Sequence, residues 1–405
     1  MLGRFSLYGF LKNQKYYEPF LLLVFLEKGL SFFQIGLLIA FRELSVTLME
    51  IPSGALADSH GRRLCMAGSM AGYIVSFIVF GFSSSFPLLF LAMFFFAVGD
   101  AFRTGTHKAM IFKWLENQGR LSEKTKVYGK TRSWSKTGTA LSSIVAAVLV
   151  WRTGTFSTVF LFCIPPYLIN LVNLLTYPKD LEEEDHGGKT LRDTVSMMKI
   201  SVLEALKFKP LRNLMVETMG FQGVHKVTGD YIQPVIKTMV ISIPLLAGLQ
   251  GDRGSAVLAG GVYFLLAVLG IFGSRFSHRL VTSAGGERGS ASFLWRVDFL
   301  CYAALIPLLF ARWYIGAIVV FILLELIQNL WRPMQVSRFD HVSPGNRRAT
   351  VLSIESQAKS FSAMIYAPVL GLLVDKFGLW TLGVSGAVIA LVVITMRNRE
   401  PQTIH

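Results

Sequence analysis

Long apolar stretches recur along this chain of 405 residues, and they limit its fold more than any other feature. A helix of about 20 apolar residues crosses a hydrocarbon core of about 30 Å, and lipid offers no partner to an exposed backbone group. Only 16% of the residues are charged, whereas 52% are hydrophobic, which leaves too little polar surface for a soluble domain. The sequence therefore predicts an all-α polytopic membrane protein.

Twelve membrane spans are expected, six on each side of a long polar segment. Lys and Arg gather in the connections that follow even-numbered spans, and the other connections hold few of them. By the positive-inside rule, this places both termini in the cytoplasm and the chain in the cytoplasmic membrane. No cleavable signal peptide is recognised, so the first span is expected to act as an insertion signal. The expected spans are residues 5–29, 33–57, 64–82, 87–111, 128–150, 154–177, 211–236, 254–276, 291–310, 313–335, 349–373 and 378–396.

The long polar segment, residues 178–210, divides the chain into predicted domains 1–177 and 211–405. It begins with an acidic run from Glu182 to Asp185. It continues with apolar residues at helical spacing, which predicts an amphipathic helix over roughly 190–208. A cytoplasmic linker between two halves of six spans each is therefore expected.

One short connection carries an unusual set of residues. Between the second and third spans the chain reads Gly-Ala-Leu-Ala-Asp-Ser-His-Gly-Arg-Arg, from Gly54 to Arg63. Glycine permits close approach of two backbones, and the arginines hold the turn on the cytoplasmic side. This run resembles the loop signature that members of the major facilitator superfamily carry between helices two and three. The predicted layout of spans extends the resemblance over nearly the whole chain.

The resemblance implies two six-helix bundles around a central cavity, each built from an inverted repeat of three helices, that move a solute by alternating access. Spans one, four, seven and ten would line the cavity. A second copy of the signature is expected at residues 273–279, with Ser277 at the aspartate position. Span five lacks the Gly-Pro pattern of the drug–proton antiporters in this superfamily, which disfavours multidrug export.

Charged residues inside spans usually face a cavity or a partner, because hydrocarbon cannot solvate them. All four spans that the resemblance assigns to the cavity carry such residues. Their surplus of cations favours an anionic or zwitterionic solute. The alternative is that pairs such as Asp100 and Arg103 close locally within one helix. The candidate substrate-binding residues are Lys12, Lys15, Tyr16, Asp100, Arg103, His107, Lys226, Asp230, Glu325 and Asn329.

Proton coupling requires a cavity carboxylate whose proton affinity changes between states. Asp100 is the first candidate, because it lies near the middle of span four within reach of Arg103, where a proton and an anionic solute could compete. The other candidates, in order, are Glu325, Asp230 and Glu18.

A further set of residues is expected to work the gates. Asp58 needs a cationic partner when the inner gate shuts, and Arg132 and Lys130 are candidates for it. A purely structural role is equally open for each residue of the set. The gating candidates are Gly54, Asp58, Gly61, Arg62, Arg63, Arg132 and Glu355.

Other classes of function find little support. The net charge of +15 follows the positive-inside pattern and does not indicate nucleic acid. The three cysteines show no metal spacing, and no Walker-type run predicts ATP binding. The favoured reading is a monomeric secondary transporter without metal or cofactor, whose partners are a small solute, membrane lipid and protons. The alternatives are a metabolite or multidrug exporter, a non-transporting receptor or scaffold, and an integral-membrane enzyme.

Overall fold

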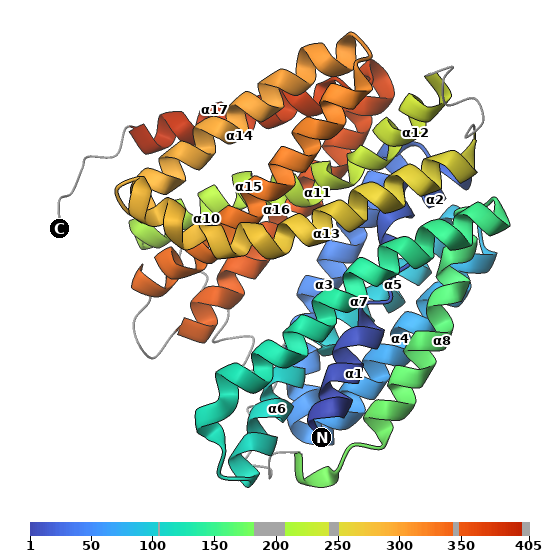
Figure 1. Cartoon of the computed structure of the whole chain (residues 1–405), viewed down its shortest axis with the longest axis vertical. Helices are drawn as coiled ribbons and strands as arrows, with labels where there is room; N and C mark the ends of the chain where they lie inside the picture. Colours follow the sequence, from blue (N-terminus) through green and yellow to red (C-terminus); the bar gives the residue numbers. More distant parts are fainter. Residues whose placement is uncertain (104–105, 182–206, 243–250, 343–347, 399–405) are drawn as a thin grey trace. The chain divides into compact units, whose positions relative to one another are not determined.

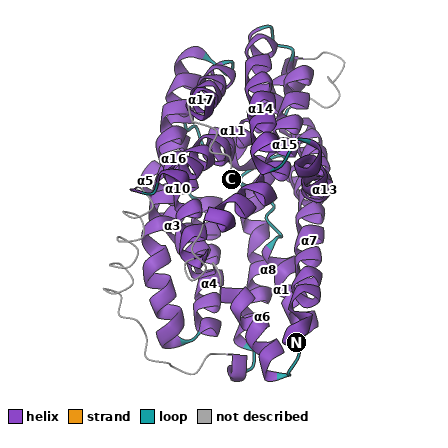
Figure 2. Ribbon diagram, turned by 90° about the vertical axis from the view of Figure 1, so that its left-hand side faces the viewer, coloured by secondary structure: helices purple, strands orange, loops and turns teal. Residues whose placement is uncertain are grey.

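A computed structural model of the chain describes residues 1–103, 106–181, 207–242, 251–342 and 348–398. Figure 2 shows helices and short connections in this described part, and no strand. The linker residues 182–206, with the acidic run and most of the expected amphipathic helix, lie outside it. The expected all-α fold class is confirmed.

Helical segments occupy all six spans expected before the linker. Span one is broken into α1 and α2 with a 3₁₀ turn between them, and span four comprises α5 and α6. The segments are α1 Leu2–Lys12, η1 Glu18–Phe20, α2 Leu21–Glu27, α3 Phe32–His60, α4 Arg62–Phe82, α5 Phe86–Arg103, α6 Thr106–Asn117, η2 Leu121–Glu123, α7 Lys124–Thr153, α8 Thr158–Leu175 and η3 Lys179–Leu181.

The six spans expected after the linker are also helical. Span seven is the most irregular, because α10 continues through a π-helical turn, a short α-helix and a 3₁₀ turn before α12 begins. The segments are α10 Lys209–Thr218, η4 Met219–Gly223, α11 Val224–Thr228, η5 Gly229–Tyr231, α12 Ile232–Ser242, α13 Asp252–Ser283, α14 Glu287–Phe310, α15 Tyr314–Val342, α16 Arg348–Phe377 and α17 Thr381–Asn398.

Nine of the described helical stretches are long and apolar enough to cross a membrane. The remaining three expected spans are one, five and seven. Spans one and seven are divided into short segments, and α7 begins with a polar half that carries several lysines. The breaks therefore fall in two of the spans that the resemblance assigns to the cavity wall, where a broken helix can be satisfied by protein and water.

Two helices run well past the ends expected for their spans. α13 continues to Ser283 and α15 to Val342, whereas ends near residues 276 and 335 were expected. An apolar criterion finds only the part of a helix that lies in hydrocarbon, and these helices continue into polar sequence. As a result, residues 273–279 lie inside α13, so no turn forms within them, and the expected second copy of the signature stays a prediction. The chain turns instead at Gly285 and Gly286.

The chain forms two compact units. Unit 1 takes in Met1–Gly29, Phe41–Met197 and Asp252–Ala267, and unit 2 takes in Leu30–Ala40, Met198–Gly251 and Val268–His405. In unit 1, α4 packs between α5 and α8, and α1 packs against α7 and α8 (Figure 1). In unit 2, α14 packs against α15 and α17, and η4 packs against α16. The third span of each half thus packs on its fourth and sixth. Helices α3 and α13 contribute residues to both units.

Two carboxylates hold the starts of helices. In unit 2, Asp375 accepts hydrogen bonds from the N–H groups of Phe32 at 3.0 Å and Phe33 at 2.8 Å, at the start of α3. In unit 1, Glu27 accepts a hydrogen bond of 2.8 Å from the N–H group of Ser157, just before α8. The first N–H groups of a helix lack helical partners and carry positive charge, so an acidic side chain there is favourable.

The signature turn forms where the sequence predicts it. α3 ends at His60, α4 begins at Arg62, and Gly61 between them has φ +89°. This left-handed conformation is strained for residues with a Cβ, which explains the glycine. A Cβ on Gly54 would meet nothing within 4 Å, so the close backbone approach expected there is not found among the described residues. Asp58 lies in the last turns of α3, and its side chain lies outside the described part.

Candidate functional site

Unit 1 brings together charged side chains from four segments of the chain. Lys12 and Lys15 come from α1 and the loop after it, and Asp100 and Arg103 come from the end of α5. These side chains lie within electrostatic range of one another. We call the group the N-terminal charge cluster, and it consists of Lys12, Lys15, Glu18, Arg42, Glu43, Asp100, Arg103 and His107.

Asp100 and Arg103 form the centre of this cluster. The Arg103 guanidinium lies 3.2 Å from a carboxylate oxygen of Asp100, and the two side chains are 24% and 31% exposed. The Tyr73 hydroxyl, from α4, donates a hydrogen bond to the same carboxylate. Arg103 Nε donates to the Tyr73 hydroxyl at 3.4 Å. The local pair expected from the i, i+3 spacing is therefore present. Tyr73 of the neighbouring helix α4 hydrogen-bonds to both members of the pair.

The other ion pairs of the cluster are also local. Lys15 Nζ lies 3.7 Å from Glu18 Oε1, with both side chains partly exposed. Arg42 lies 2.9 Å from Glu43 Oε1, and Glu43 is only 3% exposed. The alternative of local neutralisation thus holds for Lys15 and for Arg103. The side chains of both pairs nevertheless remain partly exposed, so a paired lysine or arginine can still contact a ligand.

His107 carries a buried nitrogen atom that has no hydrogen-bond partner among the described residues. Its ring stacks on Tyr8 with the centroids 4.0 Å apart and meets the edge of Phe5 at 5.5 Å. Its Nε2 is buried and makes no hydrogen bond to any described residue. Buried polar atoms are nearly always satisfied, so this nitrogen marks a place for water or a ligand atom.

Unit 2 joins His225 of α11 to Glu325 of α15. His225 Nε2 lies 2.8 Å from Glu325 Oε2, and Asn329 Nδ2 donates to the other carboxylate oxygen at 3.0 Å. The histidine follows the π-helical turn Met219–Gly223 and precedes the 3₁₀ turn Gly229–Tyr231. π-turns inside α-helices often occur at functional sites. We call His225, Glu325 and Asn329 the C-terminal polar cluster.

The remaining sequence candidates are placed as follows. Lys226 lies on α11 and Asp230 on η5, both half-buried, and half-buried Tyr16 lies in the loop between α1 and η1. Glu355 of α16 accepts a hydrogen bond of 3.4 Å from Gln222 of η4. Arg132 is exposed on α7.

The two arginines of the signature lie in the first turn of α4. Arg63 donates to the carbonyl oxygens of Leu175, at 3.4 Å, and Tyr177, at 3.1 Å, just after α8. Arg62 is half-buried beside it. The signature arginine Arg63 thus ties α4 to the end of α8 within unit 1. The gating roles proposed for this set stay predictions.

The candidate set drawn from the sequence omits Arg42, Glu43 and His225 of these clusters, and also Tyr73, which donates a hydrogen bond to Asp100. Tyr73 lies 27 positions before Asp100 and His225 lies 100 positions before Glu325. Helical spacing finds neighbours within one helix, whereas these contacts join different helices. A tyrosine within an apolar span and a histidine two residues after Gly223 were the available signals, and neither identifies a partner.

No group of three or more His, Cys, Asp or Glu residues in the described part of the chain lies close enough to hold a metal ion. The three cysteines are buried, lie far apart in the sequence and form no disulfide. The clusters therefore offer charge, hydrogen bonds and aromatic surface to a ligand.

The chain was compared with protein families, curated proteins and solved structures. It is 24% identical over 393 residues to YxaM of Bacillus subtilis (strain 168), an uncharacterized MFS-type transporter, covering 95% of this chain and 92% of that relative. The crystal structure of the nucleoside transporter NupG has the same fold, with a TM-score of 0.79 at 11% identity, and the match covers 99% of both chains. A POT family transporter in complex with 5-aminolevulinic acid has a TM-score of 0.73 at 15% identity, covering 98% of this chain and 96% of that one. The model of the Major Facilitator Superfamily matches residues 13–365, and the chain therefore belongs to this family of membrane transporters.

Proposed function

We propose that this protein is a secondary active transporter for a small organic anion or zwitterion, driven by protons. The N-terminal charge cluster is the observation that carries the proposal. Three ion pairs, Lys15 with Glu18, Arg42 with Glu43 and Arg103 with Asp100, lie in it together with Lys12, and the buried Nε2 of His107 adds a hydrogen-bonding position. This partly open cluster offers basic side chains to a carboxylate or phosphate group.

The arginine at the centre suits this role. A guanidinium presents a planar fork that matches a carboxylate or phosphate and stays charged at every physiological pH. Arg103 uses only part of its donor set on Asp100 and Tyr73. The carboxylates of the cluster would receive the amino group of a zwitterion. A similar fold holding 5-aminolevulinic acid, which carries both an amine and a carboxylate, supports this ligand class.

The test begins with binding and continues with flux. Purified protein is heated with organic anions, zwitterions such as 5-aminolevulinic acid and dipeptides, nucleosides, and matched cations. The compounds that raise the melting temperature are then offered to proteoliposomes with an imposed pH gradient. We expect hits among anions or zwitterions and accumulation driven by the gradient. Hits confined to cations, or uptake that no proton gradient changes, would contradict the proposal.

Replacing Glu325 with Gln should separate transport from the proton gradient. Glutamine retains an acceptor oxygen for Asn329 and fits the same space, but it cannot exchange a proton. We therefore expect solute exchange between equal concentrations to continue, while accumulation driven by a pH gradient falls at least tenfold. The measurement is uptake into proteoliposomes at several internal and external pH values.

The conservative variant Glu325→Asp is the matched control, because it keeps a carboxylate opposite His225. It should retain gradient-driven accumulation, with altered kinetics. If Glu325→Gln accumulates solute as the unmodified protein does, the proton site lies elsewhere, and Asp100 is the next candidate.

A further inference from the structure

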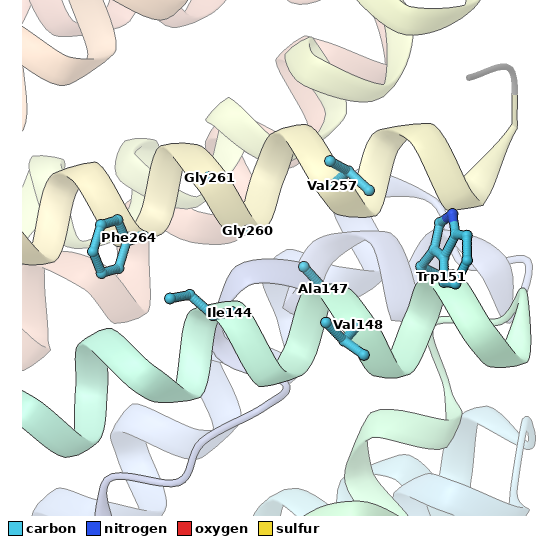
Figure 3. A pocket seen from close by; sticks show the side chains of 8 residues that line it. All are labelled: Ile144, Ala147, Val148, Trp151, Val257, Gly260, Gly261 and Phe264. Atoms are coloured by element: carbon cyan, nitrogen blue, oxygen red, sulfur yellow. The ribbon is translucent and has the colours of Figure 1, made fainter. Parts of the chain in front are cut away.

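A groove of about 350 Å³ runs between α7 and the first half of α13, within unit 1 (Figure 3). Every side chain that lines it is apolar. Ile144 and Trp151 mark its ends on α7, and Phe264 and Val257 mark them on α13. These side chains are 38–52% exposed, and α13 is apolar enough here to cross a membrane. The groove therefore opens toward the hydrocarbon of the bilayer.

Two adjacent glycines create this groove. A Cβ on Gly260 would overlap the side chain of Ala147, so this glycine sets a close crossing of the two helices. A Cβ on Gly261, by contrast, would meet nothing within 4 Å. Gly261 therefore leaves a hollow beside the tight contact at Gly260, and the side chains of Phe264 and Ile144 line this hollow. Small residues at a helix crossing in a membrane allow such close packing.

One end of the groove carries positive charge. Arg253 precedes Val257 by four residues, so it extends the groove stripe of α13 by one turn. Its guanidinium lies over Gly154, with Nε 3.7 Å from the place that a Cβ on Gly154 would take. Gly154 has φ +75° and caps the C-terminal end of α7, two residues after the exposed Arg152. Trp151 sits at the same end, and tryptophan is enriched where a membrane meets water.

We propose that this groove binds one phospholipid, with an acyl chain between α7 and α13 and its phosphate on Arg253 and Arg152. Ile144 and Trp151 are seven residues apart, so the groove is about 10 Å long, or about two thirds of one leaflet of hydrocarbon. An apolar channel of that length with cations at its interfacial end matches a lipid with an anionic head group. Arg253 and Arg152 are the two cations at this end. Of the acidic residues there, Asp252 begins α13, and Glu27 is engaged by the N–H groups of Phe156 and Ser157 at the start of α8.

Lipid retention by purified protein tests this site. The protein is stripped in detergent, titrated with dioleoyl phosphatidylglycerol and, separately, with dioleoylglycerol, and the number of bound molecules is counted by native mass spectrometry. We expect one phosphatidylglycerol to bind at least tenfold more tightly than the uncharged lipid. Gly261→Leu, whose Cβ would meet nothing within 4 Å, fills the hollow and should lower phosphatidylglycerol occupancy at least fivefold. Arg253→Gln should remove the preference for phosphatidylglycerol.

The matched control is Val392→Phe on α17, which adds comparable bulk at an exposed apolar position outside the groove. It should retain the lipid, and all variants should keep the melting temperature of the unmodified protein in the stripped state. A lipid with a photoreactive acyl chain should label peptides that contain residues 144–151 and 257–264. Equal retention by Gly261→Leu and the unmodified protein would overturn the proposal. Binding of the transported solute in the groove in place of the lipid would also overturn the proposal.

Discussion

Replacing Glu217 with Gln is expected to lower the melting temperature of the purified protein by roughly 5 to 15 °C. Glu217 is 5% exposed on α10 and binds two arginines from other helices of unit 2. Arg338 of α15 makes two hydrogen bonds to it, at 2.7 and 2.9 Å, and Arg397 of α17 lies at 2.6 Å. Removing one partner from a buried ion pair costs about 3–5 kcal/mol, because the opposite charge remains buried without compensation.

The two arginines should differ in importance. Arg338 meets both carboxylate oxygens, and Arg397 meets one and also donates to the carbonyl oxygen of Arg288 at 3.2 Å and to Ser292 at 3.0 Å. Arg338→Gln should therefore destabilise more than Arg397→Gln. The measurement is thermal unfolding in detergent, followed by tryptophan fluorescence. Retention of the peak of the folded protein on a sizing column is the second readout.

A matched control exists at the surface of unit 1. Arg120 and Glu123 form an exposed pair at 2.8 Å between α6 and α7. Exposed pairs contribute little because water solvates both charges. The Glu123→Gln variant should therefore have the same melting temperature as the unmodified protein. If the Glu217→Gln variant also keeps the melting temperature of the unmodified protein, the contact of Glu217 with Arg338 and Arg397 does not stabilise unit 2.

The positions of most helices could be predicted, because nine of the spans are apolar stretches long enough to cross a membrane, each with its own internal hydrogen bonds. The breaks could not. Span one is interrupted between Lys12 and Glu18, and span seven changes helix type at Met219 and at Gly229. Residues of this kind also occur in unbroken membrane helices, and packing against neighbouring helices decides whether the backbone departs from α geometry. Hydrophobicity averaged over a span does not record that packing.

In the candidate site, contacts within one helix could be predicted from the sequence, whereas contacts between helices could not. Asp100 with Arg103 and Lys15 with Glu18 are three residues apart, and both expected pairs form. The partner of Glu325 and the partners of Glu217 lie 100 to 180 positions away in the sequence. Spacing within a helix carries no information on these partners. From the sequence, Arg338 and Arg397 only add to the positive charge near the ends of spans, whereas the structure places both inside helices and in the Glu217 contact.

Replacing Arg103 with Ala should weaken binding of the anionic or zwitterionic solute by about 10- to 100-fold. This corresponds to loss of one charge-assisted hydrogen-bonding group, worth about 1.5–3 kcal/mol. The fold should tolerate the change, because the Tyr73 hydroxyl still donates to Asp100. Affinity is measured by thermal shift or by displacement of a labelled ligand. The exposed Lys113, paired with Glu116 at 3.1 Å, provides the control Lys113→Gln, which should bind as the unmodified protein does.

The double variant Asp100→Asn with Arg103→Gln decides between a binding pair and a structural pair. If the pair only neutralises charge, the double variant leaves no orphan charge and should recover the transport that each single change damages. If the pair binds the solute, the double variant should be stable in thermal unfolding and inactive in flux, because the anion has lost its guanidinium. We expect the second result. A double variant that transports at the normal rate with an unchanged pH dependence would exclude Asp100 and Arg103 from the site.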